Sequence, residues 1–167
     1  MCAAHRYIRV IFMTKTKWKL LILCIALPLA VGALSAFLTR GGMSDFDRVL
    51  QPPLAPPAWL FPVVWTILYT LMGISSYLVL TSGDPSKYAL LLYFVQLILN
   101  FFWSLIFFGL QNYLFAFVWL VALWAAILGT IFLFSRSSKT AALLMIPYLL
   151  WVTFAGYLNF GIYLLNR

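Results

Sequence analysis

The sequence predicts an all-α membrane protein, a five-transmembrane-helix bundle, from its composition and from the lengths and patterning of its apolar stretches. Of its 167 residues, 65% are hydrophobic and only 8% are charged, whereas soluble domains are roughly 45–50% apolar and about 25% charged. Five stretches reach the ~20 apolar residues that a helix needs to cross the membrane. These stretches lack the alternation of apolar and polar residues that is typical of a β-barrel.

The predicted spans are separated by one long connection, residues 40–57, and by short polar connections at 81–87, 111–112 and 135–140. Helices joined by such short connections must run antiparallel. The spans are expected at residues 20–39, 58–80, 88–110, 113–134 and 141–165.

A basic tail, residues 1–17, precedes the predicted domain, residues 18–167. Because Met13 begins a Met-Thr-Lys-Thr-Lys segment, residues 1–12 are interpreted as an upstream extension. The lysines followed by Leu20–Val31 also resemble a signal peptide, which is the alternative for this region.

The positive charges are distributed unequally between the two sides of the predicted bundle. Lys and Arg are retained on the cytoplasmic side during insertion, so the sequence predicts a cytoplasmic N-terminus and an outer C-terminus, in a cell membrane of bacterial type. The N-terminal side carries Arg6, Arg9, Lys15, Lys17, Lys19, Lys87, Arg136 and Lys139, and the other side carries Arg40, Arg48 and Arg167.

Residues for acid–base or metal chemistry are almost missing. The chain has no glutamate, one histidine (His5) and two cysteines, Cys2 and Cys24. We therefore expect no disulfide framework, no metal site and no required cofactor. A soluble nucleic-acid binder is also excluded, because the net charge of +8 arises from a nearly acid-free membrane chain.

Polar residues within the third predicted span share one helix face: Gln96, Asn100, Trp103 and Phe107 are spaced by four, three and four residues. An amide exposed to lipid would leave donors and acceptors unpaired at a cost of several kcal/mol, so this face should point into the bundle. Interhelical hydrogen bonding and the lining of a ligand cavity both explain it.

Two further faces combine aromatic rings with small or polar residues. Trp65 and Trp151 lie several residues inside their spans, whereas Trp18 and Trp59 fit the membrane interface where tryptophan is enriched. A planar, largely apolar ligand would suit such faces, although packing of large rings is an equal alternative. The second span contributes Phe61, Trp65 and Tyr69, and the fifth contributes Tyr148, Trp151 and Ala155.

The first connection contains Pro52-Pro53-Leu-Ala-Pro56-Pro57 and is therefore stiff. With Phe46, Leu50 and Leu54 pointing downward it could cover a cavity between the helix ends; a plain connector is the alternative.

These motifs together resemble the TspO/MBR family of tryptophan-rich sensory proteins. The resemblance runs from about residue 18 to the end of the chain and has four pieces in family order. The pieces are Leu50-Gln-Pro-Pro-Leu-Ala-Pro-Pro57, Phe61-Pro-Val-Val-Trp65-Thr-Ile-Leu-Tyr69, Gln96-Leu-Ile-Leu-Asn100-Phe-Phe-Trp103 and Pro147-Tyr-Leu-Leu-Trp151-Val-Thr-Phe-Ala155-Gly-Tyr-Leu-Asn159.

The resemblance implies a homodimeric membrane receptor or sensor that binds porphyrins such as protoporphyrin IX or haem, and in some members sterols or synthetic ligands, under the first loop. It implies that Trp65, Trp151, Gln96, Asn100, Trp103 and Ala155 line the pocket and that Pro56 and Pro57 belong to the cover. The chain departs from the family at Leu54, where a tryptophan is common.

Two other functions remain open at this point. One is an enzyme that breaks down porphyrin with light and oxygen, for which Trp65 and Trp151 would be the redox partners. The other is a facilitator of porphyrin or sterol transport. Ion-coupled transport is the least favoured, because such carriers bury ionisable groups and all 14 charges here lie outside or at the edges of the spans.

Overall fold

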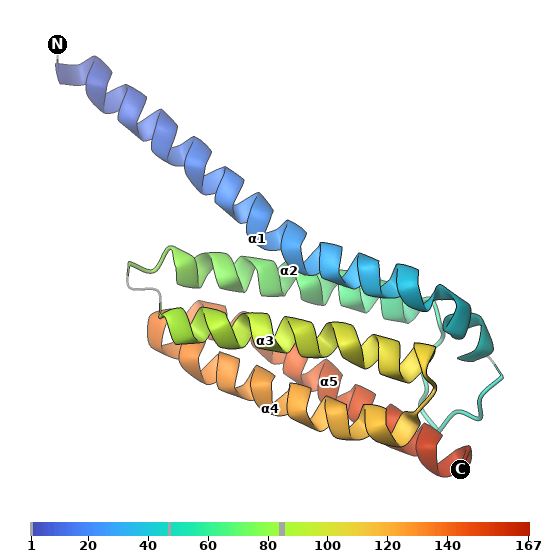
Figure 1. Cartoon of the computed structure of the whole chain (residues 1–167). Coiled ribbons are helices and arrows are strands. Elements are labelled where there is room, and N and C mark those ends of the chain that lie inside the picture. Colours follow the sequence, from blue (N-terminus) through green and yellow to red (C-terminus); the bar gives the residue numbers. More distant parts are fainter. Residues whose placement is uncertain (1, 47, 84–85) are drawn as a thin grey trace.

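The computed structural model describes residues 2–46, 48–83 and 86–167, and the side chains of 17–42, 48–83 and 86–167. Within these residues the chain is helical and has no strand (Figure 1). Five helices are long and apolar enough to cross a membrane, which confirms the predicted fold class. The helices are α1 (Cys2–Phe46), α2 (Leu60–Leu80), α3 (Lys87–Ser104), α4 (Tyr113–Ser137) and α5 (Lys139–Leu165).

The helices match the predicted spans to within three residues at each end of α2, α4 and α5, and the larger differences are at α1 and at the end of α3. The apolar part of α1 runs over Lys17–Gly42 and is longer than the predicted 20–39, and the N-terminal part of α1 projects beyond the other helices (Figure 1). The third predicted span, 88–110, ends in a short π-helix, η1 (Leu105–Gly109). Its wider turn was not expected from the sequence, and π-turns occur frequently at functional sites.

The helices form a ring in the order α1, α2, α5, α4, α3, because each helix packs against its two neighbours in that order. Helices α2 and α3 follow one another in the chain, yet they are separated in the ring by α1 on one side and by α5 and α4 on the other. Figure 1 shows α5 behind α3 and α4, with the C-terminus near the first loop.

Two glycines allow α1 to lie close against α2. A Cβ added at Gly73 would meet the backbone of Cys24 and Ile25, and one added at Gly32 would meet the ring of Tyr69. Close backbone approach through small residues is the usual way in which helices associate in membranes. The α1–α2 contact is therefore set by glycine on both helices.

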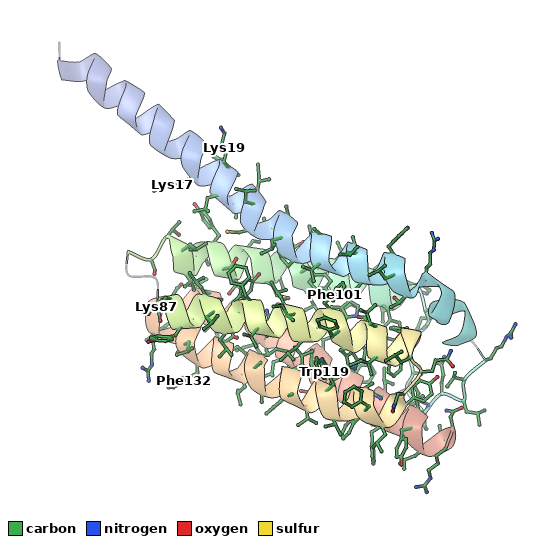
Figure 2. The ribbon with its side chains drawn as sticks, in the orientation of Figure 1. Lys17, Lys19, Lys87, Phe101, Trp119 and Phe132 are labelled. Carbon is green, nitrogen blue, oxygen red and sulfur yellow. The ribbon has the colours of Figure 1, made fainter. Side chains whose placement is uncertain are left out.

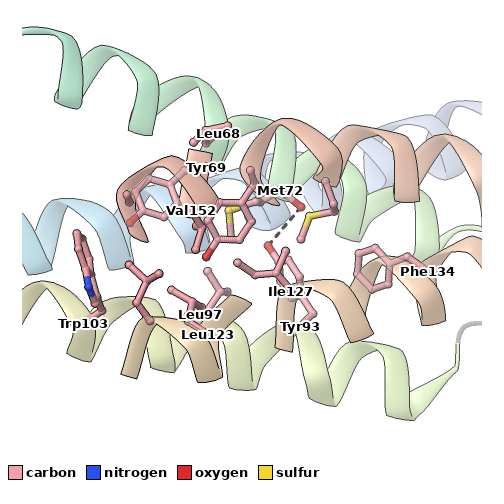
Figure 3. Close-up of a cluster of buried hydrophobic side chains, with 14 of the residues drawn as sticks. Leu68, Tyr69, Met72, Tyr93, Leu97, Trp103, Leu123, Ile127, Phe134 and Val152 are labelled. Atoms are coloured by element: carbon pink, nitrogen blue, oxygen red, sulfur yellow. Dashed lines mark hydrogen bonds between the residues drawn. The ribbon is translucent and has the colours of Figure 1, made fainter. Parts of the chain in front are cut away.

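The interior is filled by apolar and aromatic side chains from α2, α3, α4 and α5 (Figure 3). Tyr93 and Phe134 stack with ring centroids 5.8 Å apart, and the Tyr93 hydroxyl donates to the carbonyl of Met72 at 3.3 Å. Many of the remaining apolar side chains point outward, as expected for a surface that faces lipid (Figure 2). The core is therefore built mainly by α2 to α5, and a cavity lies beside α1.

Candidate functional site

A cavity of about 380 Å³ lies between α1, α2, the end of α3 and α5. This volume is at the lower end of the roughly 300–1,000 Å³ of small-molecule sites. The wall is mainly apolar and aromatic. It is formed by Leu29, Gly32, Ala33, Ser35, Ala36, Thr39, Phe61, Pro62, Trp65, Thr66, Tyr69, Trp103, Ser104, Phe108, Trp151 and Ala155.

The structure brings Trp65 of α2 and Trp151 of α5 to this one cavity. Trp65 stacks on Tyr69 with ring centroids 5.3 Å apart, and Phe61 meets Trp151 edge to face at 5.9 Å. Of the residues predicted for the site, those on the wall are Phe61, Trp65, Tyr69, Trp103, Trp151 and Ala155.

Asn100 lies behind the wall rather than on it, and it is completely buried. Its Nδ2 donates to the Tyr148 hydroxyl at 2.8 Å, and its Oδ1 accepts from the Tyr69 hydroxyl at 3.4 Å. Tyr148 is also completely buried. The amide therefore connects α3 to both α2 and α5, and it binds the hydroxyl of Tyr69, a wall residue.

Gln96 and Phe107 face the bundle as the spacing predicts, but neither lines the cavity. Gln96 is completely buried, and within the described side chains its amide atoms have no hydrogen-bond partner. Phe107 stacks on Trp103 with ring centroids 5.2 Å apart. Phe107 therefore supports a wall residue from behind.

The indole N–H groups of Trp65 and Trp151 differ from those of three other tryptophans. Trp103 donates to Asn159, Trp119 to the carbonyl of Leu99 and Trp124 to Thr153, at 3.3, 2.8 and 2.9 Å. Among the side chains that the structure describes, Trp65 and Trp151 donate to no protein group. Because lipid offers no acceptor at this depth, two donors remain for a molecule in the cavity.

The first loop is fastened to α5 and does not supply the cavity wall. Asn166 pairs its side-chain amide with the backbone of Leu50, accepting from N at 3.0 Å and donating to O at 2.9 Å. The Tyr157 hydroxyl donates to the carbonyl of Pro53 at 2.8 Å, and Pro52 packs on Gly161.

The residues expected to cover the cavity lie elsewhere. Pro56 and Pro57 are absent from the wall, as are Leu50 and Leu54, which are 63% and 82% exposed. Leu54 has a φ of 67°, a left-handed conformation that is uncommon for such a residue. The interpretation that Leu50 and Leu54 point down onto the cavity is therefore wrong, and the side chain of Phe46 lies outside those described.

The sequence analysis missed that α1 provides one whole side of the cavity. Its contribution consists of small and hydroxyl side chains between Leu29 and Thr39. The hydroxyls of Ser35 and Thr39 donate to carbonyls of their own helix at 3.1 and 2.8 Å, so their O–H donors are already used within α1. The run of small residues after Gly32 was the available signal.

The chain is similar to known proteins over most of its length. The model of the TspO/MBR family matches residues 24–165. The tryptophan-rich protein TspO of Chlorobaculum tepidum is 45% identical over 87% of this chain and 95% of its own length. The translocator protein of Bos taurus is 36% identical over 84% of this chain and 86% of its own length. The tryptophan-rich protein TspO of Archaeoglobus fulgidus is 43% identical over 87% of this chain and 96% of its own length.

Proposed function

This chain belongs to the TspO/MBR family, and from that premise we propose that it is a membrane receptor that binds porphyrins or similar planar apolar molecules in the cavity beside α1. The observation that carries the proposal is that Trp65 and Trp151 line one aromatic cavity and that neither indole N–H has a protein acceptor among the described side chains.

The chemistry of the wall supports a flat, largely apolar ligand with a few acceptor atoms. Aromatic rings favour offset stacking or edge contacts with another π system, and the wall offers Trp65, Tyr69, Trp103 and Trp151. Carboxylate or carbonyl oxygens on the ligand would accept from the two free indoles. A porphyrin has both the ring and the carboxylates, and its size requires the helices around the 380 Å³ cavity to move apart on binding.

The proposal includes a cytoplasmic N-terminus, a bacterial type of cell membrane and a homodimer. The bias of positive charge toward the N-terminal end supports the orientation, and the relatives in Chlorobaculum tepidum and Archaeoglobus fulgidus support a prokaryotic-type membrane. A cysteine placed in the first loop should react with an impermeant reagent added outside the cell. The dimer is tested by the mass of the protein in detergent.

Titration of the purified protein with protoporphyrin IX in the dark tests the binding site. Binding is read from the porphyrin absorption band, so that loss of a tryptophan does not change the signal itself. Trp65→Phe and Trp151→Phe should each weaken binding about fivefold, the effect of one hydrogen bond worth ~1 kcal/mol. Trp124→Phe is the matched control, because its indole bonds to Thr153 outside this cavity.

Equal affinity in all four proteins would refute the assignment of the cavity. Illumination of the same samples separates a receptor from an enzyme. A receptor returns the porphyrin spectrum intact, whereas an enzyme removes more porphyrin than there is protein.

A further inference from the structure

A second hollow lies on the outside of the bundle and shares no residue with the porphyrin cavity. It is a groove of about 500 Å³ between α1 and α3, with α2 as its floor. Near this groove α1 leaves the bundle toward its N-terminus (Figure 1). The groove is lined by Leu23, Cys24, Ala26, Leu27, Ala30, Ser76, Leu80, Leu90, Tyr93 and Phe94.

Both long walls of this groove lead to a lysine. On α1, Lys19 lies four residues before Leu23 and eight before Leu27, so all three share one helix face. On α3, Lys87 lies three residues before Leu90 and seven before Phe94, again on one face. In Figure 2 Lys87 lies at the start of α3, and Lys17 and Lys19 lie on the part of α1 that projects past this end of the bundle.

Exposed aromatic residues mark this end as the membrane interface. Trp18 is 66% exposed and Tyr88 is 65% exposed, and each is next to one of the two lysines. The Lys87 ammonium lies 5.3 Å from the centre of the Tyr88 ring. Tryptophan and tyrosine are enriched at headgroup level, so the ammonium groups stand where lipid phosphates lie.

The distance from Lys19 to the far end of the groove fits one leaflet. From Lys19 to Ala30 the helix rises about 16 Å, at ~1.5 Å per residue. Half of the roughly 30 Å hydrocarbon core is about 15 Å. An acyl chain that starts at the phosphate can therefore occupy the whole groove, against the small side chains of Ala26 and Ala30.

We propose that this groove binds one anionic phospholipid, with an acyl chain along α1 and α3 and its headgroup at the end of the groove where Lys19 and Lys87 lie. Charge complementarity selects this occupant over a zwitterionic lipid. The chain has only three acidic residues against eleven Lys and Arg. A lysine near the membrane surface contributes about fivefold in affinity for anionic lipid, so the two lysines give a preference of about twenty-five-fold.

Native mass spectrometry of the full-length protein in detergent tests the proposal. The probes are phosphatidylglycerol and phosphatidylcholine with identical acyl chains. The wild-type protein should retain one phosphatidylglycerol with the stated preference, and the double variant Lys19→Gln/Lys87→Gln should bind both lipids equally. Arg136→Gln/Lys139→Gln is the matched control, because it removes two charges at the same end away from the groove and should keep the preference.

A second variant tests the apolar part without altering charge. Ala26→Leu/Ala30→Leu fills the groove from its exposed side and should lower retention of phosphatidylglycerol at least about fivefold, while the circular dichroism spectrum stays unchanged. Excess inorganic phosphate should not displace the lipid.

Three results would overturn the proposal. The Arg136→Gln/Lys139→Gln control could lose the lipid preference as fully as Lys19→Gln/Lys87→Gln, which would mean that anionic lipid is attracted by the overall positive charge of this end and not by the groove. Inorganic phosphate could displace the lipid completely, which means a site for free anions. The alanine variant could change the oligomeric mass and leave lipid retention intact, which means an interface between copies of the chain.

Discussion

Asn100→Leu is expected to weaken the fold more than it weakens porphyrin binding. In the structure the amide is completely buried behind the cavity wall and bonds to the hydroxyls of Tyr148 and Tyr69. If the Asn100 amide lined the cavity, its replacement would weaken binding more than stability, because a polar group of the ligand would be left unpaired.

The expected loss follows from the two hydrogen bonds. Interhelical hydrogen bonds in membranes contribute about 0.6 kcal/mol on average and up to ~1.7 kcal/mol. The bond to Tyr148 is short at 2.8 Å and that to Tyr69 is long at 3.4 Å, so we expect a loss of about 1–2 kcal/mol in the free energy of unfolding. The Tyr69 ring keeps its stack on Trp65, and the Kd for protoporphyrin IX should change less than about threefold.

The assay is unfolding of the detergent-solubilised protein by sodium dodecyl sulfate, together with a dark porphyrin titration. Tyr148→Phe and the double variant with Asn100→Leu complete a double-mutant cycle, which isolates the energy of the shorter bond. Tyr69→Phe is the companion control for the longer bond. Normal stability with lost binding would refute the reasoning, because the amide would then have to contact the ligand.

Other predictions concern glycine, the first loop and the N-terminus. Gly32→Ala should weaken porphyrin binding, because its methyl group would push the Tyr69 ring into the cavity, whereas Gly41→Ala, which meets nothing within 4 Å, should not. Asn166→Ala removes two hydrogen bonds to the first loop, so limited proteolysis of that loop should accelerate about fivefold or more. Deletion of residues 1–12 should leave topology unchanged in a loop-labelling assay, since three lysines still precede the first span; an inverted loop would contradict this.

The five spans could be predicted from the sequence because the cost of unpaired backbone in lipid leaves long apolar segments only one regular structure. The same argument placed Gln96 and Asn100 inside the bundle, and both are completely buried. Trp65 and Trp151 stood out because they lie within spans rather than at the interface, and the structure brings both to one cavity.

The partners of these residues were decided by the tertiary structure. Lipid chains are as apolar as leucine, so an apolar helix gives no contrast between the face that packs and the face that meets lipid. For that reason the ring order, in which α5 lies beside α2, and the wall supplied by α1 could not be predicted. The bond from Asn100 to Tyr148 joins residues 48 apart in the chain, and the one from Leu50 to Asn166 joins residues 116 apart. Such contacts depend on which helices become neighbours, a choice made by packing at glycines such as Gly73 and not by any local pattern.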